Sequence, residues 1–434
     1  MVDRTGNATG RRRDFLLKSF AAVATVAAAP GALRAQPTVP PMSGAAAPEL
    51  SSFDTLLAGF VRQQKSPGAA FAMTSDSRLV YARGFGFADR PRHEAVQPDA
   101  LFRIASISKP ITAVAILQLA ERGKFSLDAK VWELLGLAAP TDVRWTKVTV
   151  RHLLHHVGGW DRDAGFDPMF RSAIIVKALG VPPPAGPAHV IRYMLEQPLD
   201  FDPGSRFAYS NFGYCLLGRV VEHASGLPYE QYVQQQVLAP LGIRRMRLDK
   251  TLPAQRSAGE VVYHATDDER RPAVMGPIVK PVPMPYGAWS IEAMDSHGGW
   301  LAAAPDLVRF ASALDNPETS RILNPASIST MFARPEGVYG QGNGDKRNGT
   351  YYACGWWVRA LGRGRGVNAW HTGSLDGTST LLVRRHDRKN WAALFNARNS
   401  RDGERLSDKV DPLIHTAVDR IRYWPSADMF DRML

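Results

Sequence analysis

Ser106 and Lys109 are the residues of this chain whose types and spacing indicate covalent chemistry. They stand in the segment Arg-Ile-Ala-Ser-Ile-Ser-Lys-Pro, and Ser106 is the only serine with a lysine three residues downstream. Residues three apart share one face of a helix, so a helix here places the lysine amine beside the hydroxyl. A serine hydroxyl is a weak nucleophile that needs a neighbouring base. Lys109 can be that base only when neutral, and burial near a helix N-terminus lowers the pKa of a lysine.

Two further polar motifs occur later in the chain, each beside a predicted element. The tripeptide Tyr-Ser-Asn at residues 209–211 is the only Tyr-x-Asn, and it lies between a Pro-Gly turn and a predicted helix over 213–222. The tripeptide His-Thr-Gly at residues 371–373 ends a segment typical of a strand. Taken singly, a core tyrosine and a surface histidine at a strand end are the better explanations of Tyr209 and His371. Together with Ser106 and Lys109 they indicate one composite active site.

With these three motifs in this order, the chain resembles the penicillin-recognising serine hydrolases. That family includes class C-like β-lactamases, serine D-Ala-D-Ala carboxypeptidases, D-aminopeptidases and related bacterial esterases. A second motif of the Tyr-x-Asn type points to the class C-like branch. The resemblance covers residues 51–397, and short sequences similar to the family's recur at 67–70, 84–86, 125–128, 153–156, 240–242 and 298–300. The chain departs from the family at Gly158, where many relatives carry serine.

The resemblance implies a role for each site residue. Ser106 attacks the substrate carbonyl and forms an acyl-enzyme, and Lys109 and Tyr209 share the proton transfer. Which of these two is the primary base stays open at this point. Backbone N–H groups of Ser106 and Ser374 are expected to hold the oxyanion. The implied substrate-binding residues are Asn211, His371, Thr372, Gly373 and Ser374.

Three of these binding residues carry more specific expectations. Asn211 is expected to orient Lys109 and the acyl side chain of the substrate. Gly373 is expected to let the substrate backbone approach the strand. β-Lactamases of this family usually carry lysine at the position of His371, whereas a histidine can be neutral near pH 7. The histidine resembles the D-Ala-D-Ala peptidases and D-aminopeptidases more than efficient β-lactamases.

The elements that must position these residues predict an α+β fold. Strands are expected near both ends of the chain, with a mostly helical region over about 127–306 between them. This pattern predicts one antiparallel sheet flanked by terminal helices, an α/β sandwich. The resemblance implies the β-lactamase/transpeptidase-like fold, with the active site between the sheet and the inserted helical region.

The individual elements are predicted from periodicity and turn signals. A first helix over 52–64 is expected to begin with a capping box formed by Ser51 and Asp54. The other expected elements are a hairpin over 69–73 and 79–87, a nucleophile helix ending near residue 123, strands over 352–360, 367–371, 378–385 and 391–396, and a last helix over 413–423. Trp357 is expected in the core, while Trp300 and Trp356 suit either core or cleft.

Residues 1–35 are predicted to be a twin-arginine export signal. Three arginines at 11–13 precede a mild apolar run over 19–29 that is too short to span a bilayer, and Ala35 fits a cleavage site. A Pro/Ala-rich linker over 36–50, a hydrolase domain over 51–425 and a tail over 426–434 are expected to follow. The mature protein is therefore expected in the periplasm or outside the cell, without a transmembrane anchor.

Composition and isolated residue types argue against other classes of function. The formal net charge is +12, falling to +8 without residues 1–35, and neither a basic cluster nor a nucleic-acid motif follows, so no nucleic-acid partner is expected. The histidines at 152, 155 and 156 are expected to pack in a loop rather than bind a metal. We expect no metal and no cofactor. Cys215 and Cys354 are expected to be isolated and buried, with a disulfide as the alternative.

These observations predict an exported serine hydrolase that forms an acyl-serine on an amide or ester. The resemblance is nearest to the D-Ala-D-Ala carboxypeptidases, D-aminopeptidases and esterases, with a class C-like β-lactamase as the alternative. The expected partner is a small-molecule or peptide substrate, cell-wall fragments included. An alternative of a different class is a catalytically idle protein that binds peptidoglycan stems in the same cleft.

Overall fold

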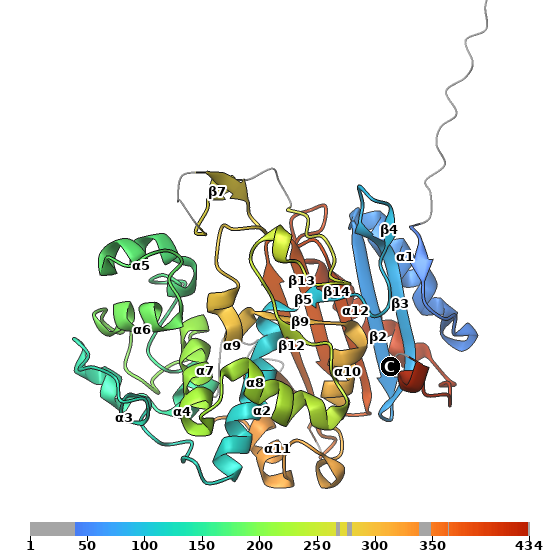
Figure 1. The fold of residues 1–434 in the computed structure, drawn as a ribbon. Helices are drawn as coiled ribbons and strands as arrows, with labels where there is room; N and C mark the ends of the chain where they lie inside the picture. The colour runs from blue at the N-terminus through green and yellow to red at the C-terminus, as the bar shows by residue number, and fades with distance from the viewer. Residues whose placement is uncertain (1–39, 266–269, 276–279, 338–348, 363, 433–434) are drawn as a thin grey trace, which may run out of the picture. The chain divides into compact units, whose positions relative to one another are not determined.

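The centre of the fold is an antiparallel sheet assembled from both ends of the chain (Figure 1). The computed structural model describes residues 40–265, 270–275, 280–337, 349–362 and 364–432, so the predicted export signal lies outside the described residues. Among the described residues, eight strands follow one another in the order β1 (Met42–Ser43), β3 (Arg78–Asp89), β2 (Gly68–Ser75), β14 (Lys389–Phe395), β13 (Thr378–Arg384), β12 (Val367–Leu375), β11 (Trp357–Ala360) and β10 (Thr350–Tyr352), and a ninth, β4 (Glu94–Ala95), pairs with β3.

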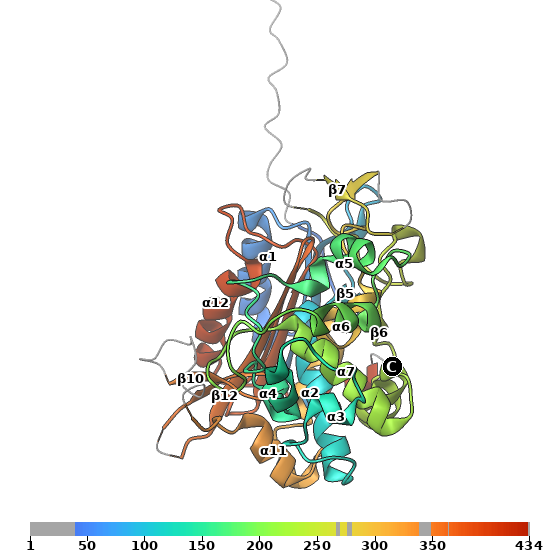
Figure 2. The same ribbon diagram turned by 90° about the vertical axis from the view of Figure 1, so that its left-hand side faces the viewer.

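The first and last helices cover one face of this sheet, as Figure 2 shows. They are α1 (Ser51–Gln64) and α12 (Leu406–Arg420). Phe53 from α1 and Leu406 from α12 pack with Trp391 of β14 in one apolar cluster, and all three are fully buried. Burial of such side chains stabilises the sandwich by about 2 kcal/mol each. The predicted sheet with flanking terminal helices is therefore confirmed.

The opposite face carries the helical region and the nucleophile helix. Helix α10 packs directly on β2 and β14, while α2 contacts α7 and α9 and is buried on almost all sides. A helix that is apolar all round belongs inside a protein, which explains why α2 lacks a polar face. The helices are α2 (Ser108–Glu121), α3 (Val131–Leu134), α4 (Val150–Leu154), α5 (Ser172–Leu179), α6 (Pro187–Leu195), α7 (Asn211–Ser225), α8 (Tyr229–Val233), α9 (Asp295–Gly298), α10 (Ala304–Ser312) and α11 (Pro325–Phe332).

Two small antiparallel sheets complete the architecture. One has the order β5 (Phe102–Arg103), β9 (Trp300–Ala302) and β6 (Arg247–Leu248), and the other pairs β7 (Arg270–Pro272) with β8 (Pro281–Pro283). Strand β5 leads straight into the segment that carries Ser106. The small sheet thereby fixes the approach to the nucleophile.

Three local predictions are wrong, each for a physical reason. No side chain caps α1, because a 3-10 helix over Pro48–Leu50 runs into it, and Asp54 instead accepts a hydrogen bond from Tyr81. The strand predicted over 352–360 is the hairpin β10–β11, because Gly355 adopts a left-handed conformation with φ of +80°. Helix α12 begins at Leu406, seven residues earlier than predicted, and accommodates Pro412 because its apolar face is buried on the sheet.

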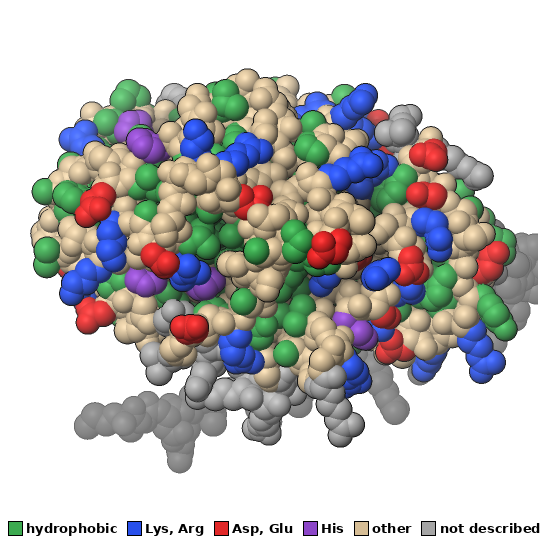
Figure 3. Space-filling model, turned by 90° about the horizontal axis from the view of Figure 1, so that it is seen from below, with side chains coloured by type: hydrophobic (Ala, Val, Ile, Leu, Met, Phe, Trp, Pro, Cys, Tyr) green, Lys and Arg blue, Asp and Glu red, His purple; other side chains and the backbone are tan. Residues whose placement is uncertain are grey.

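The described surface mixes charges of both signs. On the face drawn in Figure 3, basic and acidic side chains are interspersed with apolar ones. Within the described ranges, none of the helices combines the length and apolar character needed to cross a membrane.

Candidate active site

Ser106 lies in a strained turn between β5 and α2. It belongs to a 3-10 helix over Ala105–Ile107 that continues into α2, and the preceding Ala105 has a φ of +46°. Non-glycine residues rarely adopt this conformation, and such strain is common where a structure holds a reactive group in place. Ser106 is partly exposed, whereas Lys109 in the first turn of α2 is 0% exposed. Ser106 therefore reaches solvent while the neighbouring amine of Lys109 does not.

Gly373 allows β12 to pack against the nucleophile segment. A Cβ atom at this position would lie 2.1 Å from the carbonyl oxygen of Ile104 and 2.2 Å from Oγ1 of Thr380. The structure thus gives Gly373 a packing role, and the approach of a substrate backbone to this residue stays a prediction. Strand β11 pairs with β12 only up to Trp370, so the next residues of β12, which hold the His-Thr-Gly motif, lie beyond that pairing.

Lys109 is buried among uncharged hydrogen-bonding partners. Its Nζ lies 3.1 Å from Oγ of Ser106, 2.8 Å from Oδ1 of Asn211 and 2.9 Å from the carbonyl oxygen of His297. Burial lowers the pKa of Lys109 well below its ordinary value. The nearby positive charge of Arg162 lowers this pKa further, and the carboxylate of Asp167 raises it in part. The environment therefore favours a neutral amine.

Asn211 is held in one orientation by Asp167. Asn211 is the first residue of α7, whose preceding residue Ser210 accepts a hydrogen bond from the backbone N–H of Gly213. The side-chain Nδ2 of Asn211 donates to Oδ2 of Asp167 at 2.6 Å. Because a carboxylate accepts and does not donate, the amide oxygen must face Lys109. The contact between Asn211 and Lys109 expected from the sequence is present.

Tyr209 is packed between an imidazole and a guanidinium. Its ring centroid lies 4.2 Å from that of His156 and 4.5 Å from the guanidinium carbon of Arg162. Nζ of Lys109 lies 4.8 Å from the same centroid. Burial raises the pKa of the Tyr209 phenol above its ordinary value, while hydrogen bonding to Ser106 and the charge of Arg162 lower it in part. The phenol therefore keeps its proton at neutral pH.

His371 is a buried neutral side chain. Its Nε2 lies 3.1 Å from the hydroxyl of Tyr352, its Nδ1 lies 2.7 Å from the carbonyl oxygen of Thr372, and it is 2% exposed. Burial lowers the pKa of His371 to about 3. The imidazole therefore brings no positive charge to the site, in agreement with the neutral histidine expected from the sequence.

Two cavities open beside Ser106. The first, of about 370 Å³, holds several large apolar side chains among polar and charged ones, and we call it the apolar cavity; the second, of about 310 Å³, carries three arginines, two of which also line the first, and we call it the arginine cavity. Ser106, Arg162, Ser374 and Arg398 line both cavities. The apolar cavity is also lined by Ala105, Phe170, Asn211, Met284, Trp289, Met294, His297, Gly298, Leu375 and Asp376. The arginine cavity is also lined by Tyr209, Trp357, His371, Thr372 and Arg405.

The tryptophans differ from expectation in one respect. Trp357 is half-buried and lines the arginine cavity, so its predicted place in the core is wrong. Trp300 and Trp356 are 0% exposed and belong to the core. A half-buried position at the start of β11 explains the difference, because the side chain at this end of the strand borders the cavity.

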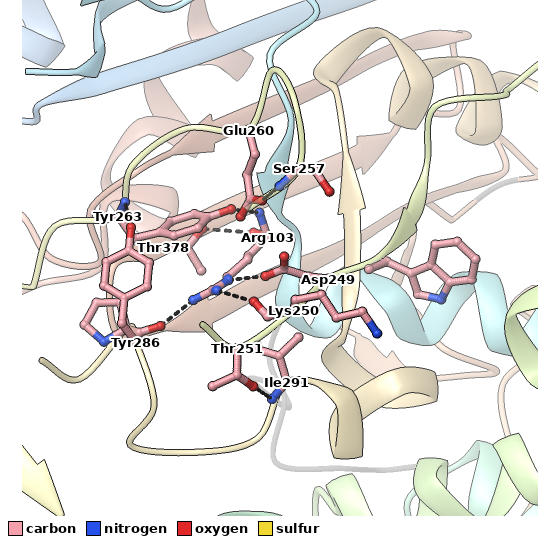
Figure 4. A network of polar contacts seen from close by, with 12 residues as sticks. Arg103, Asp249, Lys250, Thr251, Ser257, Glu260, Tyr263, Tyr286, Ile291 and Thr378 are labelled. Carbon is pink, nitrogen blue, oxygen red and sulfur yellow. Dashed lines mark hydrogen bonds and ion pairs between the residues drawn. The ribbon is translucent and has the colours of Figure 1, made fainter. Parts of the chain in front are cut away.

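A second buried cation lies just before the nucleophile, in β5 (Figure 4). The guanidinium of Arg103 forms an ion pair with Asp249, donates to the carbonyl oxygen of Lys250 at 3.0 Å and lies 4.4 Å from the ring centroid of Tyr263. The hydroxyl of Thr378 on β13 donates to the carbonyl oxygen of Arg103 at 2.9 Å. This network ties the nucleophile segment to the main sheet.

Comparison with known proteins places the chain in a family. Residues 53–413 match the family model named Beta-lactamase. The chain belongs to the β-lactamase family. It is 32% identical to the esterase EstB of Burkholderia gladioli over 255 residues, which are 57% of this chain and 60% of the esterase. It is 27% identical to penicillin-binding protein 4 of Amycolatopsis lactamdurans over 272 residues, 61% of this chain and 65% of that protein.

A solved structure agrees with this assignment. The octameric penicillin-binding protein homologue of Pyrococcus abyssi is 25% identical, with a TM-score of 0.64, and the match covers 84% of this chain and 77% of that one. The chain spans less than two thirds of the length of the two curated relatives named above. The β-lactamase/transpeptidase-like fold and membership of a family of serine hydrolases, both expected from the sequence, are confirmed.

Two of the histidines and both cysteines singled out in the sequence lie inside the fold. His155 and His156 are buried, and the described residues contain no cluster of ligands that could hold a metal ion. Cys215 and Cys354 are both free and buried, so the disulfide alternative is wrong. Sγ of Cys354 lies 3.4 Å from Nε2 of His155.

Several residues of the site had no signal in the sequence. Arg162 and Asp167 lie in a loop rich in Asp and Gly, where charged residues are ordinarily solvated. His156, His297 and Tyr352 reach the site only because distant elements pack together. Among these five, only His156 is singled out in the sequence, where it is expected to pack in a loop rather than bind a metal, and no pattern there indicates its contact with the ring of Tyr209.

Proposed function

We propose that this chain is an exported serine hydrolase in which Ser106 is acylated with neutral Lys109 as the base. The observation that carries this proposal is the set of three partners around the Lys109 amine. A neutral amine has two N–H donors and one lone pair. The oxygens of Asn211 and His297 can only accept, so they take the two donors. The lone pair is left for the hydroxyl of Ser106.

The opposite pKa shifts of Lys109 and Tyr209 support different roles in proton transfer for these two residues. Burial lowers the pKa of Lys109 and raises the pKa of Tyr209. Lys109 is therefore suited to take the proton of Ser106, and the Tyr209 phenol is suited to donate a proton to the leaving group. General acid and base groups with pKa values shifted in this way contribute about 100-fold to 10000-fold each to the rate.

The proposed reaction has two halves. Oγ of Ser106 bonds to the substrate carbonyl carbon as its proton passes to Lys109, and backbone N–H groups of Ser106 and Ser374 stabilise the oxyanion. The bond to the leaving group then breaks as that group takes the phenol proton of Tyr209, which regains a proton from the Lys109 ammonium. A water molecule then attacks the acyl-enzyme as its proton passes to the neutral Lys109 amine, and the bond to Ser106 breaks as Oγ takes that proton back and the acid is released.

The substrate is proposed to be an ester or an amide. The relatives include a protein named as an esterase and one named as a penicillin-binding protein. The neutral His371 argues against efficient β-lactam hydrolysis, because the β-lactamases of this family place a fixed positive charge there. Export through the segment 1–35 to the periplasm, or outside the cell, is part of the same proposal.

Covalent labelling tests the proposed function. Purified protein is incubated with a fluorescent fluorophosphonate and a fluorescent penicillin, and the labelled residue is identified by mass spectrometry. We expect label on Ser106, lost in Ser106→Ala and retained in Ser108→Ala, a matched control whose hydroxyl donates only to the carbonyl oxygen of Ala105. Label that persists in Ser106→Ala would contradict the proposal.

A turnover panel separates the enzyme from a binding protein. Nitrocefin, short p-nitrophenyl esters and D-amino-acid amides are compared with reversible binding of D-Ala-D-Ala peptides. We expect turnover of an ester or an amide at a rate that exceeds turnover of nitrocefin. Peptide binding without labelling or turnover would instead favour the catalytically idle alternative.

A further inference from the structure

Tyr209 lies in a stretch of chain that belongs to no helix or strand. Residues 207–210 have no regular secondary structure, and α7 begins only at Asn211. The phenol of Tyr209 nevertheless hydrogen-bonds to Ser106. A proton donor acts only within hydrogen-bonding reach of the leaving atom, and a displacement of about 1 Å costs much of its effect. Contacts from elsewhere in the fold must therefore hold Tyr209 in place.

One residue, His156, binds the backbone on both sides of Tyr209. The backbone N–H of Ala208 donates to the carbonyl oxygen of His156 at 2.9 Å. The backbone N–H of Ser210 donates to Nδ1 of the His156 imidazole at 3.1 Å. Between these two bonds the imidazole lies against the phenol ring, with 4.2 Å between the centroids of His156 and Tyr209. His156 therefore fixes both the backbone and the ring of Tyr209.

The backbone of His156 has a conformation that few non-glycine residues adopt. Its φ is +58°, and it directly follows His155, the C-cap residue of α4. The N–H of His156 donates to the carbonyl oxygen of Leu153, and the N–H of Val157 donates to that of His152, which together make a Schellman motif. Glycine or asparagine is the usual residue at this position. A histidine there carries strain of the kind found where a side chain has a function.

The hydrogen bond from Ser210 fixes the orientation of the His156 imidazole. Because Nδ1 accepts this bond, the hydrogen of the neutral ring sits on Nε2. Nε2 is buried and has no hydrogen-bonding partner among the described residues. Burial lowers the pKa of His156 well below its ordinary value, so Nδ1 keeps its lone pair at neutral pH. The polar contact of this side chain is thus directed at the segment that carries Tyr209.

We propose that His156 is a positioning residue that holds the Tyr209 phenol where it donates a proton to the leaving group. This inference rests on the proposed function, in which Tyr209 is that donor. His156 lines neither of the two cavities beside Ser106, so it acts through Tyr209 and not on the substrate. Loss of the Nδ1 acceptor should therefore slow only those substrates whose leaving group needs a proton.

Two esters that share an acyl group and differ in the leaving group test this inference. Ethanol leaves only with a proton, whereas p-nitrophenol leaves readily as an anion. In His156→Leu, which removes the acceptor, we expect kcat/KM to fall at least about tenfold for ethyl acetate and less than about threefold for p-nitrophenyl acetate. His156→Gly also lacks the acceptor and suits the left-handed position, so it should show the same difference between the esters even where the leucine variant does not fold.

His156→Asn is the matched variant that keeps the acceptor. Asparagine adopts the left-handed conformation, and its amide oxygen takes nearly the place of Nδ1. We expect kcat/KM for ethyl acetate to stay within about threefold of the parent value. A loss in His156→Asn as large as in the leucine and glycine variants would overturn the inference. So would an equal loss for both esters in a leucine or glycine variant with native circular dichroism, because that result indicates a merely structural role.

A double-variant cycle with Tyr209→Phe separates this inference from the proposed function. Tyr209→Phe should lower kcat/KM for ethyl acetate more than for p-nitrophenyl acetate. Added His156→Leu should then change the ratio of the two values by less than about twofold, because the positioned hydroxyl is already absent. A further large change in this ratio would overturn the inference alone. Equal losses for both esters in Tyr209→Phe itself would overturn the proposed role of Tyr209, and the inference with it.

Discussion

Arg103 and Lys109 are buried cations on the same segment, and the protein surrounds them in opposite ways. Arg103 is 2% exposed and forms an ion pair with Asp249, which also raises its pKa. Lys109 is 0% exposed, and its hydrogen-bonding partners are a hydroxyl, an amide oxygen and a backbone carbonyl. A buried charge persists when it is paired and is lost when it is not. This difference supports a structural role for the first cation and the proposed role of the second in proton transfer.

Arg103 and Lys109 also differ in the partners that their removal would leave behind. Removal of Arg103 leaves the Asp249 carboxylate, itself 1% exposed, without its cation. Removal of Lys109 leaves Asn211 and a carbonyl oxygen without one donor each, but no unpaired charge. Loss of Arg103 should therefore lower the stability of the protein, and loss of Lys109 should lower its activity.

Lys109→Met gives the largest expected effect. Loss of the base should lower kcat by about 1000-fold or more, while the acceptors left without a donor lower the free energy of unfolding by only about 1–3 kcal/mol. Stopped-flow acylation and urea unfolding measure the two quantities. A loss of several kcal/mol of stability would mean that this amine is charged and paired, contrary to our comparison.

Arg103→Met should do the reverse. Breaking a buried ion pair by removing one partner costs about 3–5 kcal/mol of unfolding free energy. The double variant Arg103→Met, Asp249→Leu removes both charges and should recover most of that loss. Urea unfolding of the single and double variants checks this, and an equally unstable double variant would contradict an ionic role for the pair.

Glu260→Gln tests the Arg103 network through the pH dependence of the free energy of unfolding. Burial and the charge of Asp249 raise the pKa of Glu260 to about 7. The folded state therefore holds this proton to higher pH than the unfolded state, so the stabilisation is complete below about pH 4.5 and is lost as pH rises through about 7. At pH 8 the variant should be more stable than the parent by about 3 kcal/mol, and at pH 4.5 nearly equal to it. Urea unfolding of variant and parent measures the difference in stability, and an equal difference at pH 4.5 and pH 8 would refute this account.

The loop that carries Arg162 and Asp167 gives the smallest expected effects, of opposite sign. Arg162 lowers the pKa of Lys109 and Asp167 raises it. Activity needs the neutral amine, so it rises with pH through the pKa of Lys109. Arg162→Gln should move the acid limb of kcat/KM to higher pH and Asp167→Asn should move it to lower pH, each by about one unit. Shifts in the same direction would contradict the electrostatic account.

How much of this could be predicted from the sequence depends on how local each signal is. The spacing of Ser106 and Lys109 is set within one helical turn, and β12, β13 and β14 are short runs bounded by turn residues, so the sequence alone predicts both. The split of the strand at Gly355 depends on its close approach to the Lys109 backbone, where a Cβ would lie 2.9 Å from the carbonyl oxygen. No local pattern records such a contact.

The same limit applies to the charges around the site. Arg162, Arg398 and Arg405 are single residues in loops or at element ends, and each resembles an ordinary solvated cation until the fold brings the three together. The contrast between Arg103 and Lys109 is equally invisible, because Asp249 and Asn211 lie more than one hundred residues away from both.

The protonation state of Lys109 in solution tests the central claim most directly. Protein labelled with carbon-13 at lysine Cε is titrated by NMR, and the resonance absent from Lys109→Met is followed with pH. We expect this resonance to titrate well below 10.5, the ordinary pKa of a lysine, so that the amine is neutral over the pH range in which Ser106 is acylated. A titration near 10.5 would show a charged amine at neutral pH and contradict Lys109 as the base.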